Sequence, residues 1–373
     1  MMMETPKPEP SSSPDAEDVK HARLRRRHGW NFVRRRGKFV AGLCIISLFY
    51  FAVLFADFLA PYDYRAQSRR EPLAPPTPIR FRDTSGNLHA RPFIYERHVV
   101  NALERHYVES TERVYPIILF ARGYSYKLFG LLETDVHLFG VGGAERANVP
   151  RVHLLGTDAA GRDRLSRLLV ATRFSLIVGP AGTLLASALG IFLGCIAGYA
   201  GPRTDALLMR AADTMMALPT LVLILAARAA FPLELPPARA VVLLVTIFTV
   251  VGWAEMARLA RGQVLALRRR EFVLAAVGLG LSPARILFRH ILPNAARPLI
   301  VQASLMLPTF LLAETALSFL GVGLQEPEAS WGNMLAAAGD INLLRESGLV
   351  LLTPAFALLL FVLGARLLSD NPD

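Results

Sequence analysis

Cysteine is scarce in this 373-residue chain, which contains Cys44 and Cys195 and no other. Both lie in apolar stretches, so we expect each to pack as a small hydrophobic side chain, without a disulfide framework or a metal cluster. The sequence has no GxxxxGK[ST] phosphate loop, no HExxH motif and no GxSxG motif. These absences argue against ATP binding by that route and against protease or hydrolase chemistry. We therefore expect no catalytic residue, cofactor or metal in this chain.

Acidic residues are outnumbered, with 30 Asp and Glu against 41 Lys and Arg and a net charge of +11. Ten of the basic residues fall within residues 1–38, whose first half is rich in Pro, Ser and Glu. Such a composition is typical of disorder, and we predict a disordered basic segment over residues 1–38. No aromatic platform or recognition helix accompanies the charges, so we expect no binding to nucleic acid.

Apolar residues dominate the remainder, since 53% of the chain is hydrophobic and the mean hydropathy is +0.37. Several uncharged runs approach the twenty residues that a helix needs to cross a bilayer. The prediction is an all-α polytopic membrane protein with six transmembrane helices. The expected spans are Phe39–Ala60, Phe174–Ala200, Ala211–Phe231, Ala240–Ala257, Pro298–Val322 and Gly348–Leu368.

The distribution of charge in the loops predicts the orientation. Basic loops stay on the cytoplasmic side, which places residues 1–38 inside. With six spans, the loop 258–297 is also cytoplasmic, and it carries eight Arg against the single acid Glu271. The loop 323–345 has the opposite balance and should lie outside. The two signals agree on a cytoplasmic N-terminus.

A polar insert of about ninety residues, 61–152, separates the first anchor, 39–60, from a core at 153–373 that holds the other five spans. Turn residues between extended segments predict strands, and the pattern of residues 99–110 predicts a helix. We expect a small extracytoplasmic α+β domain. It could contact a solute-binding protein or serve as a packing appendage.

Residues 271–294 are predicted to form two short helices in the cytoplasmic loop 258–297. Gly280 should end the first helix, Ser282 and Pro283 should begin the second, and Pro293 should end it. The small side chains of Ala275 and Ala276 would permit close approach of another protein. This segment resembles the EAA loop of ABC-importer permeases. The residues to which the resemblance gives a role in coupling to an ATPase are Glu271, Ala275, Ala276, Gly280, His290, Leu292 and Pro293.

Two positions depart from the EAA pattern, because Leu274 replaces the usual acid and His290 stands where isoleucine is usual. A second motif, before the second span, is similar to the LGTDxxGRDxxSRL signature of dipeptide and oligopeptide permeases. Its matching polar and glycine positions are Gly156, Thr157, Asp158, Gly161, Arg162, Asp163, Ser166 and Arg167.

The local physics of this signature predicts an amphipathic helix lying at the outer membrane interface. Thr157 or Asp158 could cap the helix. Acidic and basic residues four positions apart predict two ion pairs, one between Asp158 and Arg162 and one between Asp163 and Arg167.

The resemblance implies an ABC type I importer permease fold in the inner membrane of a prokaryote, with di- or oligopeptides as cargo. It further implies a second homologous permease, two cytoplasmic ATPase subunits that bind ATP and Mg, and an extracytoplasmic solute-binding protein. Nickel or another small solute is an alternative cargo. Two other classes stay open: a secondary transporter that works without ATPases, and a membrane-anchored scaffold whose outer domain is the working part. The sequence does not identify the residues of the substrate path.

Overall fold

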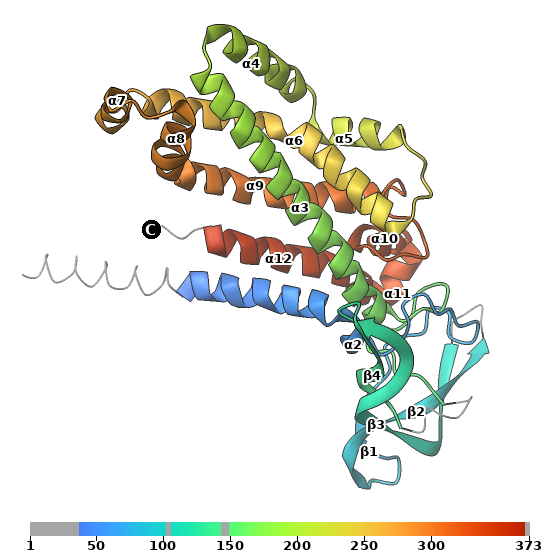
Figure 1. Ribbon diagram of the computed structural model, residues 1–373. Helices are drawn as coiled ribbons and strands as arrows, with labels where there is room; N and C mark the ends of the chain where they lie inside the picture. Colours follow the sequence, from blue (N-terminus) through green and yellow to red (C-terminus); the bar gives the residue numbers. More distant parts are fainter. Residues whose placement is uncertain (1–36, 102–105, 143–148, 370–373) are drawn as a thin grey trace, which may run out of the picture.

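The computed structural model describes residues 37–101, 106–142 and 149–369, so the basic segment predicted over residues 1–38 falls almost entirely outside it. The chain forms a bundle of helices with a β-sheet projecting from one end (Figure 1). The α7 segment lies at the other end of the long helix α3, Arg164–Tyr199.

Within the described residues, four helical runs are long and apolar enough to cross a membrane. They are the first helix Gly37–Leu54, α3, α6 at Pro237–Leu267, and the continuous run Pro283–Phe319. That last run comprises α8 (Pro283–Ile286), the π-helical turn η1 (Leu287–Ile291) and α9 (Leu292–Phe319). The shorter elements of the bundle are α2 (Ala56–Leu59), α10 (Trp331–Ala336), η2 (Ala337–Gly339), α11 (Ile341–Leu351) and α12 (Thr353–Ser369).

The third predicted span, Ala211–Phe231, is not one straight helix. It is divided between α4, Pro202–Met216, and α5, Thr220–Ala229, whose axes differ by 86°. Pro219 lies at the break, where a residue without an N–H cannot continue the helical hydrogen-bond ladder. If this bent pair is one span, the described chain has up to five, and the apolar helix α12 is shorter than the others.

Contacts between helices establish the direction of each. Gly182 faces Phe248, Gly190 faces Met256 and Gly198 faces Val264. The residue numbers of both helices rise together, so α3 and α6 run parallel. The α4–α5 pair must therefore return the chain along the length of the bundle between them.

Other helix pairs run antiparallel. In the pair α3 and α9, Ser175 bonds to Glu314 and Ser187 lies 4.0 Å from the sulfur of Met306. The first helix and α12 are also antiparallel, because Gly42 faces Leu367 while the rings of Phe49 and Phe361 meet at 5.4 Å.

Glycine allows α3 and α6 to pack closely. A methyl group added at Gly194 would stand 2.3 Å from the carbonyl oxygen of Ala257, and one at Gly190 would stand 2.5 Å from that of Trp253. Small residues at four-residue spacing are the usual means by which membrane helices approach each other. The glycine stripe Gly190, Gly194 and Gly198 is thus the contact surface of α3 for α6.

The insert is a four-stranded antiparallel sheet in the order β1-β2-β3-β4. Its strands are β1 (Arg80–Arg82), β2 (Leu88–Asn101), β3 (His106–Leu128) and β4 (Leu132–Val141). The helix predicted at residues 99–110 is wrong over the part described, because Val99 of β2 pairs with Tyr107 of β3. Valine and tyrosine favour strands, and this preference prevailed over the helical spacing. The described residues of 61–152 contain no helix, so the α+β expectation is corrected to a β-sheet.

Candidate functional site

The segment 271–294 begins with a helix and then a break, as its sequence predicts. Helix α7 spans Glu271–Gly278, and Gly280 follows with a φ of +73°, a left-handed conformation that glycine adopts without strain. Ser282 has the extended backbone of an N-cap and Pro283 opens α8, although the Ser282 side chain makes no capping bond. The first helix and its break are where the sequence places them.

The second helix of the segment does not end at Pro293. The π-helical turn η1 joins α8 to α9, and Pro293 lies in the first turn of α9, where its missing N–H is tolerated. The amide of Asn294 bonds to the His290 carbonyl at 2.7 Å. The second part of the segment is therefore a rigid extension of a long apolar helix.

One side of α7 packs against the bundle. Val273 and Ala276 are 1% and 4% exposed, and they join a buried cluster with Ile286, Ile291 and Cys195. The sequence interpretation of Ala276 as a contact for another protein is therefore not supported by its position, because its side chain faces this chain's own core. Glu271 and Ala275 are exposed, and His290 and Leu292 are half-buried.

Around this packed side, α7 exposes large apolar side chains. This exposed apolar face is made up of Phe272, Leu274, Val277 and Leu279, with Phe288 nearby in η1; their exposed fractions run from 41% to 81%. Contiguous exposed apolar side chains on a soluble surface commonly mark a protein contact. Leu274, the departure from the usual acid, belongs to this face.

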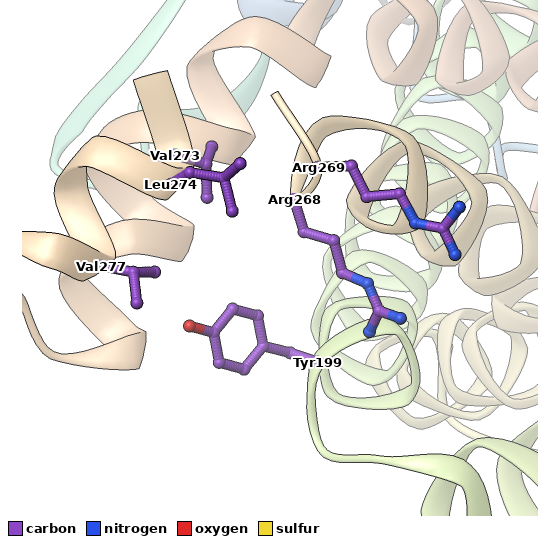
Figure 2. A pocket seen from close by; sticks show the side chains of 6 residues that line it. All are labelled: Tyr199, Arg268, Arg269, Val273, Leu274 and Val277. Carbon is purple, nitrogen blue, oxygen red and sulfur yellow. The ribbon is translucent and has the colours of Figure 1, made fainter. Parts of the chain in front are cut away.

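A cavity of about 320 Å³ lies beside this face (Figure 2). It is lined by Val273, Leu274 and Val277 of α7, by Tyr199 at the end of α3, and by Arg268 and Arg269 after α6. Arg268 donates a 2.9 Å hydrogen bond to the Gly198 carbonyl, which fixes the loop that carries α7 to the end of α3. The loop that carries α7 thus follows directly on α6 and is bonded to the end of α3.

The signature at residues 156–167 forms a polar network at the opposite end of α3. Arg162 pairs with Asp158 at 2.7 Å, as the four-residue spacing predicts. Arg162 and Arg167 both reach Glu326, which follows α9 in the chain, and the Arg167 contact measures 3.0 Å. These pairs tie the start of α3 to the loop between α9 and α10.

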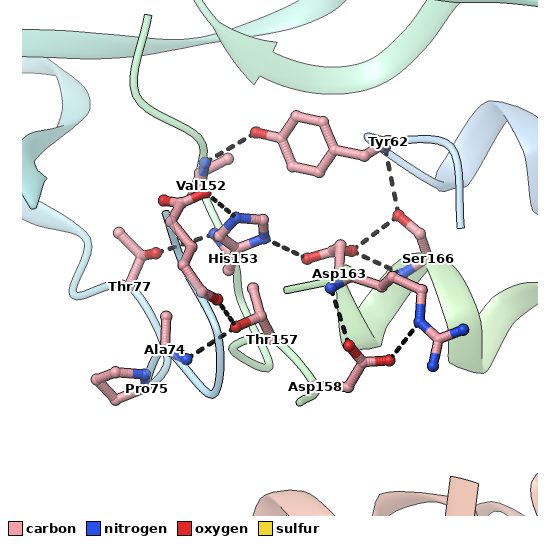
Figure 3. A network of polar contacts seen from close by, with 12 residues as sticks. Tyr62, Ala74, Pro75, Thr77, Val152, His153, Thr157, Asp158, Asp163 and Ser166 are labelled. Carbon is pink, nitrogen blue, oxygen red and sulfur yellow. Dashed lines mark hydrogen bonds and ion pairs between the residues drawn. The ribbon is translucent and has the colours of Figure 1, made fainter. Parts of the chain in front are cut away.

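Asp163, and not Thr157 or Asp158, caps helix α3 (Figure 3). Its Oδ2 accepts hydrogen bonds from the backbone N–H of Ser166 at 2.7 Å and from the Ser166 hydroxyl at 2.8 Å. Its Oδ1 accepts from the His153 ring at 2.8 Å. The predicted pair between Asp163 and Arg167 does not form, and Arg167 lies 3.6 Å from Asp158 instead.

The expected amphipathic interface helix is also corrected. Residues 164–173 are the first turns of α3 itself, and Arg164, Ser166 and Arg167 are buried. Protein atoms rather than lipid head groups surround them. Chain segments that come before and after the signature in the sequence cover this end of α3 and shield it from water.

Glycines permit this close folding. Gly156 and Gly161 have φ values of +68° and +74°, and a methyl group at Gly161 would stand 2.0 Å from the Ser68 carbonyl oxygen. Thr157 accepts a 2.8 Å hydrogen bond from the Ala74 N–H and donates to the Glu71 carbonyl. The segment 68–77 is thus held directly against the signature.

His153 lies between two carboxylates, those of Asp163 and, at 3.3 Å, Glu71. Desolvation lowers the pKa of His153, but the hydrogen bonds and charges of Asp163 and Glu71 outweigh burial and raise it. Burial acts to raise the pKa of Glu71, but hydrogen bonding to His153 outweighs it and lowers this pKa. Because carboxylates only accept, both ring nitrogens face acceptors, and this arrangement favours the positively charged imidazolium.

Sequence reasoning missed His153, Glu71 and Glu326 as members of this network. His153 stands just before the signature in the sequence, and this position could have marked it as a member of the network. Glu71 and Glu326 lie 82 and 164 residues from the partners they bond, His153 and Arg162. No local pattern marks such contacts. Within residues 37–101, 106–142 and 149–369, no group of three or more His, Cys, Asp or Glu is arranged to hold a metal ion.

Comparison with known proteins gives two family matches. Residues 190–371 match the family described as binding-protein-dependent transport system inner membrane component. Residues 26–76 match the N-terminal TM domain of oligopeptide transport permease C. Neither match covers residues 77–189, which include most of the β-sheet insert and the signature network.

Three relatives illustrate the similarity. The oligopeptide transport system permease protein OppC of Bacillus subtilis is 40% identical over 182 residues, which is 49% of this chain and 58% of the relative. A putative peptide permease protein of Brucella suis is 36% identical over 219 residues, covering 59% of this chain and 70% of the relative. The dipeptide transport system permease protein DppC of Alkalihalophilus pseudofirmus is 38% identical over 219 residues, covering 59% and 69%.

The apolar bundle and these matches define a polytopic membrane permease. The chain belongs to the family of inner membrane components of binding-protein-dependent transport systems.

Proposed function

We propose that this chain is the permease subunit of an ATP-binding-cassette importer for di- or oligopeptides. The names of the relatives, which are oligopeptide, dipeptide and putative peptide permeases, support the cargo class. The exposed apolar face of α7 is the observation that carries the coupling role. A permease for nickel or another small solute is the alternative.

The proposed assembly contains a second homologous permease, two cytoplasmic ATPase subunits and an extracytoplasmic solute-binding protein. The ATPases bind ATP and Mg. This chain crosses the bilayer six times, counting the α4–α5 pair and α12 as one crossing each, with its N-terminus inside. The helix directions support this count, because α3, α6 and α12 run one way while the first helix and α9 run the other.

Coupling in this proposal passes from the ATPase to α7 and then to the membrane helices. Leu274, Val277 and Phe272 insert into a groove of the ATPase, while Val273 and Ala276 fix α7 to the bundle. Because α7 is short and its loop is bonded to the end of α3, displacement of α7 by the ATPase tilts α3 and α6 together. The β-sheet insert and the signature network lie outside, where the binding protein delivers cargo.

Leu274→Lys tests the coupling contact. Its side chain is 57% exposed, so the change leaves the fold intact while placing a charge in an apolar contact. We expect an affinity pull-down from mild detergent to recover a P-loop ATPase with the unchanged protein and at least tenfold less with the variant. Each 1.4 kcal/mol lost at the interface gives a factor of ten.

Leu131→Lys is the matched control, because Leu131 is 90% exposed in the turn between β3 and β4 at the opposite end of the molecule. It should recover the ATPase normally. Equal recovery with Leu274→Lys would remove the exposed face of α7 from the contact. Recovery of no ATPase from the unchanged protein would favour a transporter or scaffold that works without one.

A further inference from the structure

A second cavity, of about 330 Å³, opens on the surface of the bundle at the bend between α4 and α5. It is away from both the α7 face and the signature network, and α6 and α9 form its other walls. The lining includes Met215 and Met216 at the end of α4, Glu255 on α6, and Gln302, Met306 and Phe310 on α9.

Glu255 places a carboxylate in this cavity from an apolar helix. Its side chain accepts a 3.2 Å hydrogen bond from the amide of Gln302 on α9. Within the described chain, no ion pair includes Glu255, while Arg258 on the same helix pairs with Asp213. An ionised carboxylate on a membrane helix is costly against lipid and faces water or a partner group. Glu255 is exposed in this chain, so its carboxylate is open to water or to a further partner group.

The end of α4 adds a second negative feature to the same cavity. The helix ends at Met216, so its carbonyl end, with its negative partial charge, opens there. Pro219 has no N–H and cannot donate the helical hydrogen bond to the carbonyl of Met215. The carboxylate and the helix end together favour a positively charged group with several N–H donors.

The rest of the lining suits a ligand whose other parts vary. Met215, Met216 and Met306 are flexible thioether side chains that adapt to different shapes, and the ring of Phe310 closes one side. Gln302 donates through its amide nitrogen to Glu255, which leaves the amide oxygen as a further acceptor. A charged acceptor fixed beside adaptable apolar walls recognises one constant group on variable molecules.

We infer that Glu255 and Gln302 form a binding site for the α-ammonium group of a peptide passing along this face of the bundle. The inference rests on the proposed function. The ammonium group donates to the carboxylate of Glu255 and to the amide oxygen of Gln302, while the first side chain of the peptide lies against the methionines. The site identifies the end of the cargo that this permease contacts.

The test uses the complete transporter, with both permeases, the ATPases and the binding protein, reconstituted in proteoliposomes. Peptide uptake is measured for the unchanged protein, for Glu255→Gln, for the conservative Glu255→Asp and for Glu234→Gln. Glu234 is an exposed acid in the loop before α6 and serves as the matched control. Binding of cargo to the binding protein is the same in all four samples, so differences arise in the membrane.

We expect Glu255→Gln to lower the maximal uptake rate about tenfold, which is the effect of losing one hydrogen bond to a charged group. Glu255→Asp should keep most of the rate, and Glu234→Gln should match the unchanged protein. The concentration of loaded binding protein at half-maximal rate should not change. Uptake by Glu255→Gln at the rate of the unchanged protein would overturn the inference.

A crosslinking experiment locates the end of the peptide directly. Two peptides carry a photoactivated diazirine, one in the side chain of the first residue with its ammonium free and one in that of the last. We expect the first peptide to label residues 251–256 or 302–310 of the unchanged protein. The amount of this label should decrease in the Glu255→Gln variant. Preferential labelling of these residues by the second peptide would overturn the inference.

The two proposals fail in different ways. If the reconstituted unchanged protein takes up no peptide, the proposed function fails and this inference falls with it. If uptake is normal but does not depend on Glu255, the proposed function stands and the ammonium site alone is wrong.

Discussion

The carboxylate of Asp163 both caps a helix and bonds to a buried histidine ring. Its Oδ2 caps α3, and its Oδ1 holds the imidazolium of His153, which Glu71 holds from the other side. The His153 and Asp163 side chains are each 1% exposed, while that of Glu71 is 18% exposed. The start of the helix therefore depends on a buried charge that stays paired.

Asp163→Ala should lower the stability of the protein by about 3 kcal/mol, because it removes an N-cap and leaves the buried His153 with one partner fewer. The measurement is the melting temperature in detergent followed by tryptophan fluorescence. Glu112→Ala, at an exposed position of β3, is the control and should change little. Equal melting temperatures for both variants would show that the cap does not contribute to stability.

The stability of this network should also depend on pH. The raised pKa of His153 contributes stability that is complete below its unfolded value of about 6.5 and is lost as the pH rises through the folded value. The lowered pKa of Glu71 contributes stability above its unfolded value of 4.5 that is lost as the pH falls through the folded value. The network is thus most stable between these two unfolded values.

His153→Gln tests this pH dependence. Between pH 6 and pH 9 the unchanged protein should lose about 1–3 kcal/mol more stability than the variant, because the glutamine side chain of the variant does not lose a proton over this range. Melting temperatures recorded across this range give the comparison. Parallel profiles for the two proteins would show that another group causes the pH dependence.

At the scale of helices, the packing of α3 on α6 depends on small residues. The four-residue spacing of Gly190, Gly194 and Gly198 was visible in the sequence. The sequence did not show which helix packs against these glycines, because any apolar helix can lie against a small-residue surface. The structure selects α6, and the parallel direction of the pair requires the α4–α5 connection to run the length of the bundle.

Gly194→Leu should separate α3 from α6 and destabilise the bundle by about 2 kcal/mol or more, because the new side chain meets backbone atoms that cannot move aside. Gly262→Leu on α6 is the matched control, since nothing lies within 4 Å of a methyl group added there. Unfolding in increasing denaturant, followed by circular dichroism, compares the two. Similar midpoints for both variants would contradict the close packing.

For the molecule as a whole, the insert and α7 lie at opposite ends of α3 (Figure 1). The proposed topology places the insert outside the cell and α7 inside. Cysteines introduced at Leu131 and Leu279, which are 90% and 81% exposed, report these two ends. Cys44 is replaced by serine in both proteins because it is exposed, whereas Cys195 is buried.

A membrane-impermeant maleimide should label Leu131→Cys in intact cells and Leu279→Cys only after the membrane is opened. The reagent cannot cross the bilayer, so labelling reports the side directly. Both cysteines labelled in intact cells would mean that the ends lie on the same side, and the proposed orientation and six crossings would then be wrong.

Much of the architecture followed from the sequence alone. Apolar runs predicted the long helices, because a bilayer leaves backbone groups no partners but their own helix. Gly280 predicted the break after α7 because its conformation is one that other residues avoid. The ion pair of Asp158 and Arg162 followed from helical spacing even though it forms just before α3. These features depend on neighbours in the chain.

Tertiary contacts decided the rest. Periodicity places Val273 and Ala276 on one side of α7 but does not say that this side meets the bundle, so Ala276 was interpreted as outward-facing. The pattern at residues 99–110 fits a helix until β3 supplies a strand to pair with. Asp163 bonds to His153 rather than Arg167 because Glu326, far along the chain, attracts Arg167. Contacts between residues distant in sequence depend on where the folded chain brings them, and local spacing carries no record of that.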